Sequence, residues 1–228
     1  MAIGNPVSIL APVFTSSVGP FTTSGTTANA PVGSLVVLCF GAFGATPSIT
    51  TVTDSASNTY QAAVVSAFDS ASPGLVVAMW YGFVTTALPI GGTFTINGGW
   101  ATASGMYIED IMSISGLTGV LDATNSTVSA TGVTNVSLPV GPFVTNNEIV
   151  IALLASTLHG ISSYNEGSGF TTQALTNAAV DSWQIVSSGS PVTWNPNWTG
   201  SVNSAAVIAS FSGTPTLYPF QGYVETEF

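Results

Sequence analysis

The stretch 52–60, VTDSASNTY, has the spacing closest to a ligand-binding loop in this chain. Asp54 and Asn58 stand where the first and fifth positions of a calcium loop would be. The third position is Ala56, which offers no side-chain ligand, and a calcium loop also needs further carboxylates, a turn glycine and a distal Glu. Short Asp and Asn side chains also bond to nearby backbone amides and hold turns. The stretch therefore favours a turn that ends at Tyr60, with Asp54 and Asn58 as weak metal candidates.

Paired carboxylates are the other chemistry that the acids could perform, because glycosidases use two carboxyls about 5–9.5 Å apart. Glu109 and Asp110 are adjacent in an expected strand, so they point to opposite faces unless a bulge intervenes. No G-x-S-x-G nucleophile motif is present. The remaining candidates are scattered through segments expected to be loops: Asp69, Asp122, Glu166 and Asp181. The sequence predicts that the chain is not an enzyme and has no catalytic residues.

One histidine and one cysteine are the soft metal ligands of the chain. His159 follows an apolar run and is expected in a loop, while Cys39 lies inside the apolar run 35–40. Free cysteine is among the most buried residue types, so Cys39 is expected to pack as a small hydrophobe. A zinc site needs several convergent ligands, and a single cysteine forms no disulfide framework. No cofactor is predicted.

Two tryptophans flank a polar turn in the stretch WNPNW. If exposed, Trp194 and Trp198 could stack on a sugar ring while Asn195 and Asn197 bond to its hydroxyls. Tryptophan is highly buried on average, which favours the other interpretation, in which Trp194 packs inward and Trp198 covers the end of the fold. The pair is the candidate glycan-stacking site.

The chain of 228 residues contains no Lys or Arg and has ten acids, which give a net charge of −10. Because phosphate neutralisation needs cations, nucleic-acid binding is not expected, and anionic substrates are disfavoured. No ion pair between side chains can form unless His159 is protonated. Stability must therefore come from apolar burial and backbone hydrogen bonds, and trypsin has no internal site to cut.

The stretch 31–60 carries the pattern around which the rest of the chain is organised. It contains a turn, an apolar strand, a loop and a polar turn that ends in an aromatic residue. No helix-length segment has apolar residues at a period of 3.6, and the composition rich in Val, Thr, Ser and Gly is typical of sheets. Strands are expected at 34–40, 50–53, 59–67, 75–84, 92–96 and 107–115.

A second block after residue 146 echoes the first. The apolar run 148–154 parallels 35–40, and 206–213 parallels 111–116. The expected fold is an all-β, antiparallel, jelly-roll-like or Ig-like sandwich with two pseudo-repeated halves and extended arms. The expected parts are an N-terminal arm or edge strand at 1–30, a first half at 31–119, a bridging segment at 120–145, a second half at 146–213 and a C-terminal arm at 214–228.

The C-terminal arm is rich in proline and aromatic residues, which suits an interaction surface. Folding back onto the same chain is the alternative. The N-terminus has no basic segment of a signal peptide, and no apolar run is long enough to span a bilayer. The candidate interaction residues of the arm are Leu217, Tyr218, Phe220, Tyr223 and Phe228.

The pattern PVGSLVV, then VTDSASNTY, MWYGFV and SISGL followed by VLD, resembles a β-sandwich family found in phage structural proteins and bacterial surface proteins. The family string is roughly V-T-D-S-x-x-N-x-Y, which residues 52–60 match. The resemblance covers residues 31–122 well and 146–213 loosely. It implies a sandwich used for display or assembly rather than for chemistry.

The leading functional prediction is a non-enzymatic bacteriophage virion protein, either a capsid decoration protein or a tail-surface subunit. Its partners would be copies of itself and other virion proteins such as a major capsid protein, and its place the virion surface. The alternatives are a carbohydrate-binding or adhesion module at the cell surface, and a prokaryotic surface-layer or filament subunit. Neither nucleic acid nor membrane insertion is expected.

Overall fold

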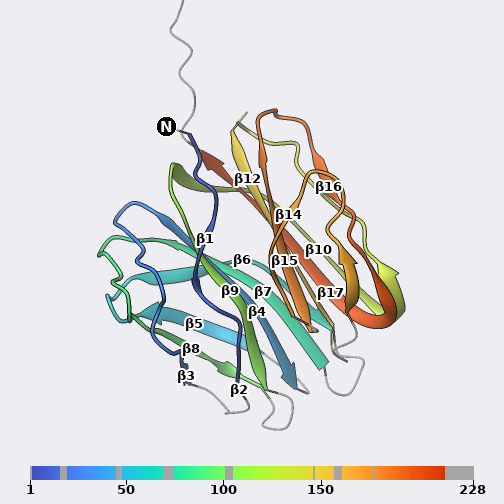
Figure 1. Cartoon of the computed structure of the whole chain (residues 1–228), viewed down its shortest axis with the longest axis horizontal. Coiled ribbons are helices and arrows are strands. Elements are labelled where there is room, and N and C mark those ends of the chain that lie inside the picture. Colours follow the sequence, from blue (N-terminus) through green and yellow to red (C-terminus); the bar gives the residue numbers. More distant parts are fainter. Residues whose placement is uncertain are drawn as a thin grey trace, which may run out of the picture.

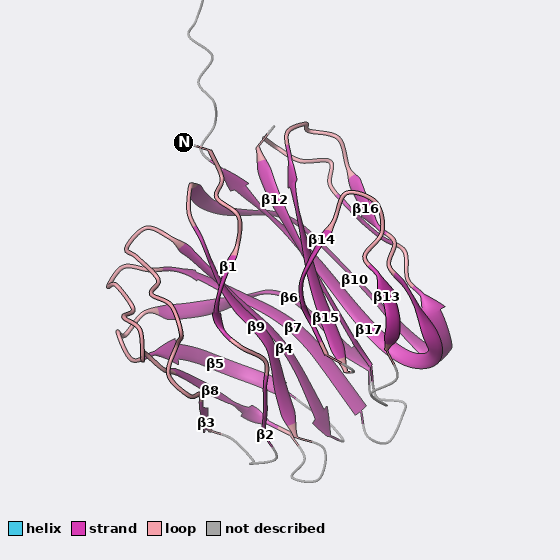
Figure 2. Cartoon of the chain, viewed as in Figure 1, coloured by secondary structure: helices cyan, strands magenta, loops and turns pink. Residues whose placement is uncertain are grey.

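The computed structural model describes residues 2–15, 20–44, 48–68, 74–100, 105–145, 147–156, 161–176 and 178–213. Within these ranges the chain is all-β and forms no helix (Figure 2). Two curled antiparallel sheets pack face to face, so the fold is a β-sandwich (Figure 1). No described segment forms a helix able to cross a membrane.

The first sheet contains nine strands in the order β1-β9-β4-β7-β6-β5-β8-β3, with β2 also paired to β9. Short strands from the N-terminal segment close both of its edges, because β1 and β2 pair with β9 and β3 pairs with β8. The nine strands are β1 (Val7–Leu10), β2 (Val13–Thr15), β3 (Phe21–Thr22), β4 (Leu35–Gly44), β5 (Ser48–Asp54), β6 (Thr59–Phe68), β7 (Gly74–Phe83), β8 (Phe94–Gly99) and β9 (Met106–Ile114).

The second sheet contains six strands in the order β10-β17-β12-β15-β14, with β13 also paired to β17. A separate two-stranded sheet, formed by β11 and β16, covers its outer face. The strands of the second half are β10 (Leu117–Asn135), β11 (Leu138–Val140), β12 (Glu148–Ser156), β13 (Ser162–Asn165), β14 (Thr171–Leu175), β15 (Ala179–Val186), β16 (Val192–Trp194) and β17 (Asn197–Gly213).

One hydrophobic core lies between the two sheets and is called the shared core below. Alternate residues of β4 face it from the first sheet, and alternate residues of β12 face it from the second. Since side chains alternate between the faces of a strand, the remaining residues of β4 and β12 point away from this interface. Both strands are buried along their whole length, which explains their unbroken apolar sequences.

Each sheet also has an outer core of its own. The first sheet curls so that Phe94 and Ile96 of β8 cover Phe40 and Trp80 on its outer face. The outer face of the second sheet is covered by β11 and β16, with Trp194 at the centre. The molecule is therefore built from two individually covered halves that are joined by the shared core.

The strand order of the first half is repeated in the second. The order β9-β4-β7-β6 corresponds to β17-β12-β15-β14, and the β3–β8 pair corresponds to the β11–β16 pair. In β4 the residues Leu35, Val37 and Cys39 face the shared core, and in β12 the counterparts Ile149, Ile151 and Leu153 do so. The expectation of two pseudo-repeated halves within a sandwich is confirmed.

The segment 120–145 was expected to bridge the halves, but most of it belongs to the second sheet. Its first sixteen residues, 120–135, lie in β10, which begins at Leu117 and pairs with β17. Many side chains of β10 are only partly buried or exposed, so Ser and Thr are tolerated there and the apolar signal is weak. The C-terminal arm, residues 214–228, lies outside the described residues.

Candidate functional site

The candidate metal residues Asp54 and Asn58 form a closed hydrogen-bonded turn between β5 and β6. The Asp54 carboxylate accepts from the backbone N–H of Ala56 and of Asn58, both at 2.9 Å. It also accepts from the Asn58 Nδ2 at 2.8 Å and from the Tyr60 hydroxyl at 2.7 Å. All four donors belong to the turn itself, and Asp54 is buried. The carboxylate is therefore used to hold the turn.

Asn58 joins this turn to the segment that follows β7. Its Oδ1 accepts from the backbone N–H groups of Thr85 and Thr86 at 2.8 and 2.9 Å, and its Nδ2 donates to the Thr86 carbonyl at 2.8 Å. Among the described residues, no group of three His, Cys, Asp or Glu side chains is placed to hold a metal ion. The motif V-T-D-S-x-x-N-x-Y here clamps two loops of the first half together.

The tryptophans of the candidate glycan site are buried in the outer core of the second half. Trp194 has no exposed surface and packs at a ring-centroid distance of 6.3 Å from Phe170, and Trp198 is 4 % exposed. Neither indole presents a face for a sugar in this conformation. The WNPNW stretch instead anchors the small β11–β16 sheet to the second half.

Other residues of the sequence predictions lie outside the described part of the chain. These are Asp69, His159 and the interaction residues of the C-terminal arm, Leu217, Tyr218, Phe220, Tyr223 and Phe228. Two acids expected in loops lie in strands instead, since Asp122 is in β10 and Asp181 is in β15. Both strands contain polar residues around these acids, and such a polar sequence is also typical of a loop.

A β-bulge in β9 brings two acids to the same face. Cys39 pairs with Asp110, but the next residue of β4, Phe40, pairs with Ile108, so Glu109 is the extra residue. A bulge re-aims side chains that would otherwise alternate. Glu109 accepts a hydrogen bond from Thr176 of the second half, at 2.9 Å from Oε2. The sequence predicted opposite faces for these two acids unless a bulge intervened, and the structure contains such a bulge.

Asp181 completes an acidic cluster, defined here as Glu109, Asp110 and Asp181, together with the Cys39 thiol. The four side chains are at most 1 % exposed and interact electrostatically across the interface of the two sheets. Each carboxyl has one oxygen bonded: Asp110 Oδ1 accepts from Ser8 Oγ at 2.6 Å, and Asp181 Oδ1 accepts from the Ala174 N–H at 2.9 Å. The other oxygen of each carboxyl has no hydrogen-bond partner in the part of the chain that the structure describes.

Burial raises the pKa of every acid in this cluster. The pKa of Glu109 rises to about 8, although the hydrogen bond from Thr176 opposes the shift. The pKa of Asp110 rises to about 6, opposed by the hydrogen bond from Ser8. Burial also raises the pKa of Asp181, and the nearby Asp110 and Glu109 add to the effect. The Cys39 thiol has a raised pKa for the same reasons, burial first and Asp181 next.

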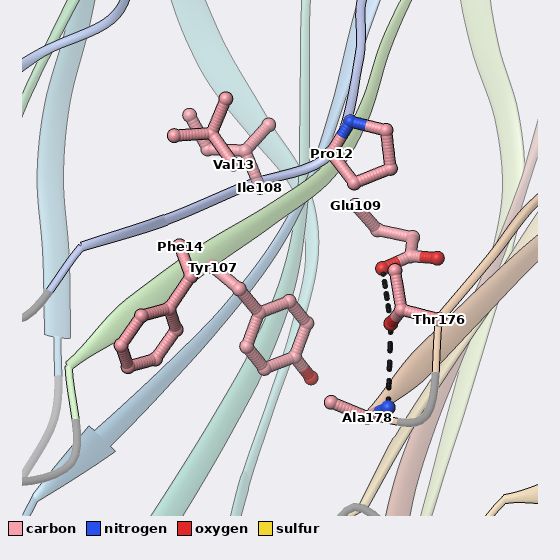
Figure 3. Close-up of a pocket in the computed structure, with 8 residues that line it drawn as sticks. All are labelled: Pro12, Val13, Phe14, Tyr107, Ile108, Glu109, Thr176 and Ala178. Atoms are coloured by element: carbon pink, nitrogen blue, oxygen red, sulfur yellow. Dashed lines mark hydrogen bonds between the residues drawn. The ribbon is translucent and has the colours of Figure 1, made fainter.

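A cleft of about 220 Å³ lies beside this cluster, at the seam between the two halves (Figure 3). The first half contributes residues of β2 and β9 and Pro12 before β2, and the second contributes Thr176 and Ala178. Figure 3 shows the Glu109 carboxyl directed at Thr176, and the Tyr107 hydroxyl directed towards Ala178. The lining residues are Pro12, Val13, Phe14, Tyr107, Ile108, Glu109, Thr176 and Ala178.

The residues that line this cleft could support few kinds of catalytic chemistry. Glu109 is the one carboxyl in its described lining, and an acid–base mechanism of the glycosidase type needs two. The unbonded Glu109 Oε1 is also shielded from solvent. A second, more polar hollow of about 340 Å³ lies where β6 meets β7, lined by Thr59, Tyr60, Gln61, Tyr81, Gly82 and Phe83, and contains no carboxyl among its described residues.

Sequence reasoning identified the individual acids but missed the cluster that they form. The adjacent pair Glu109-Asp110 inside an otherwise apolar strand was the available signal. Asp181 lies 71 residues beyond Asp110 in sequence and meets it only because the two sheets pack face to face. Comparison of the chain with protein-family models, with curated proteins and with solved structures finds no match.

Proposed function

We propose that this chain is a non-enzymatic structural protein of a bacteriophage virion, a capsid decoration or tail-surface subunit that assembles through sheet edges and its C-terminal arm. The observation that carries the proposal is the edge strand β10. It is 19 residues long, whereas the strands at the other sheet edges have between two and five residues. An open strand edge presents unpaired backbone groups to a partner.

Strand β10 lacks most of the features that keep an edge from pairing. Natural edges are blocked by lysine, by proline or by short length, and the residues 117–135 contain neither Lys nor Pro. Asp122 is the single charged residue of the strand. Bulges interrupt its two ends, but the pairing with β17 is regular from Thr124 to Ser129. Within this run we propose Thr124–Val128 as the contact with a strand of a neighbouring subunit, although the Thr127 carbonyl already accepts a hydrogen bond from Ser66 Oγ of β6 at 3.5 Å.

The composition of the chain also supports a subunit packed at high copy number. A chain without Lys or Arg offers no tryptic site, and its net charge of −10 keeps the free subunit soluble. Both faces of each sheet are covered by the shared core and the outer cores. The sheet edges and the arms therefore remain for contacts with other subunits. The resemblance of residues 52–60 to the sandwich family of phage structural and bacterial surface proteins points the same way.

The location of the native protein tests the proposal. Particles from the source would be purified on a density gradient and digested with chymotrypsin or Glu-C, since trypsin leaves the chain whole. We expect many copies per particle, co-sedimenting with capsid protein. Recovery on cell envelopes instead would favour a surface-layer or filament subunit, which uses the same edge pairing. Recovery as a free protein, absent from particles, would refute the virion assignment.

A further inference from the structure

We propose that Glu109, Asp110 and Asp181 form a proton-dependent latch between the two halves, closed while the carboxyls are protonated and loosened when they ionise. Glu109 and Asp110 belong to the first half and Asp181 belongs to the second. The bulge in β9 turns both acids of the first half towards the interface. The latch therefore joins the two sheets at the shared core.

The three carboxyls are buried with unfilled hydrogen-bonding capacity. Glu109 Oε1, Asp110 Oδ2 and Asp181 Oδ2 are shielded from water and have no hydrogen-bond partner among the described residues. A neutral carboxyl carries its own O–H donor, whereas an ionised carboxyl has acceptors alone. In a cluster of acceptors, bound protons are thus the missing donors. A buried charge without a partner is costly, so ionisation here opposes the closed interface.

Among the described residues, the surroundings of the cluster supply no positive charge. The titratable groups near it in the described part of the chain are the Cys39 thiol of β4, the Tyr107 hydroxyl of β9 and the Tyr164 hydroxyl of β13, and none is cationic. Thr176 and Ser8 provide neutral hydroxyl donors. The whole chain has no Lys or Arg. Ionised carboxyls in this cluster therefore repel one another, and no cation from Lys, from Arg or from the described residues compensates them.

The direction of the pH effect follows from the pKa values. In an unfolded chain these carboxyls titrate near pH 4. In the folded chain the pKa of Asp110 is about 6, that of Glu109 is about 8, and that of Asp181 is also raised. The folded state therefore binds more protons than the unfolded state above pH 4. The stabilisation is complete below pH 4 and is lost as the pH rises through 6 to 8.

Thermal and urea unfolding between pH 5 and pH 9 test the latch. We expect the unfolding equilibrium constant of the wild-type protein to rise at least about tenfold over this range. The isosteric variants Glu109→Gln, Asp110→Asn and Asp181→Asn should each flatten the dependence. The control is Glu166→Gln, which removes a partly exposed carboxyl outside the cluster and should leave the slope unchanged.

Two further features separate the latch from simpler causes. Repulsion between surface acids is screened by salt, so a pH dependence of stability that vanishes in 0.5 M NaCl would overturn the proposal.

Glu148 is a second buried acid outside the cluster. Burial raises its pKa to about 7, and Asp122 adds to the shift, so Glu148 contributes a pH dependence of its own. Glu148→Gln should lower the slope and leave a remainder that the cluster variants remove. Removal of the whole slope by Glu148→Gln would refute the latch.

Cys39 is a built-in reporter of the interface, since it is fully buried beside the three acids. Its reaction with a thiol reagent would be measured at pH 7 and pH 8.5, relative to a free thiol at each pH. We expect relative labelling to accelerate at pH 8.5 in the wild-type protein and to change less in Asp181→Asn. Equal acceleration in both proteins, or none in the wild type, would contradict opening at the cluster.

Discussion

At the scale of single residues, Asp54 is the acceptor around which the turn between β5 and β6 is built. It gathers four donors from its own turn, and through Asn58 the turn reaches the loop at Thr85 and Thr86. A carboxylate that is so fully bonded has little capacity left for a cation. Its role is to fix the position of the strand end that carries Tyr60.

Replacing Asp54 by Ala should destabilise the protein by about 2–4 kcal/mol, because buried donors lose their acceptor. Urea unfolding measures this change. The matched control is Ser55→Ala, which removes an exposed hydroxyl that accepts one bond from the Thr93 N–H and should change stability by less than about 1 kcal/mol. Added calcium should leave the melting temperature of the wild type unchanged. A rise that disappears in Asp54→Ala would instead identify a calcium site.

The sequence predicted the local part of this arrangement and not its distant part. Asp54, Asn58 and Tyr60 are within seven residues, so turn chemistry is enough to connect them. The contact of Asn58 with Thr85 spans 27 residues and depends on how β7 returns beside β6. The same holds for Glu109 and Asp110, whose convergence depends on one inserted residue that no local pattern marks.

At the scale of elements, β10 combines two duties. It pairs with β17 along one edge, and its side chains close the second half, with Leu121 packed against the shared core and Ala123 and Val133 against the outer core. Its other edge ends the sheet. About half as many residues of such a strand need to be apolar as in a central strand, which is buried on both faces. The sequence therefore revealed β4, β7 and β12 clearly and left β10 hidden in a Ser/Thr-rich passage.

A lysine placed on β10 should prevent subunit pairing without unfolding the subunit, because a charged side chain at a strand edge is costly to bury against another strand. Ser126→Lys substitutes an exposed residue in the middle of the regular run. We expect assembly, followed by analytical ultracentrifugation or electron microscopy, to be lost while the melting temperature stays within a few degrees.

The matched control for the edge variant is Thr50→Lys. Thr50 is also exposed, but its strand β5 lies inside the first sheet between β6 and β8. This variant adds the same charge and should assemble as the wild type does. Equal assembly of both variants would exclude β10 as the contact edge, and equal loss would show that the added charge alone is responsible.

At the scale of the whole molecule, the shared core makes the two halves interdependent. Each half covers the outer face of its own sheet, but the inner face of each sheet is covered by the other half. Alternation in the sequence could predict that both faces of β4 and β12 are buried. It could not show that these two strands face one core, because both halves carry the same pattern.

Residues 1–116 produced alone should fail to form a stable monomer, because the inner residues of β4, β7 and β9 would be exposed to water. Size-exclusion chromatography with light scattering should show a dimer or an aggregate. Co-production with residues 117–228 should restore a one-to-one complex with the circular dichroism spectrum of the whole chain. A well-folded monomer of residues 1–116 would disprove the dependence.

The repeated strand order allows corresponding positions of the two halves to be compared. Cys39 and Leu153 occupy corresponding places, and the strand neighbours of Cys39 are Met79 and Asp110, whereas those of Leu153 are Asp181 and Val207. Each of the two aspartates thus corresponds to an apolar residue in the other half, Asp110 to Val207 and Asp181 to Met79. Two identical copies of either half would carry its own aspartate twice and would lack the other. Because the two halves of this one chain differ in sequence, a single interface can hold an unequal set of acids, which two identical halves related by symmetry could not provide.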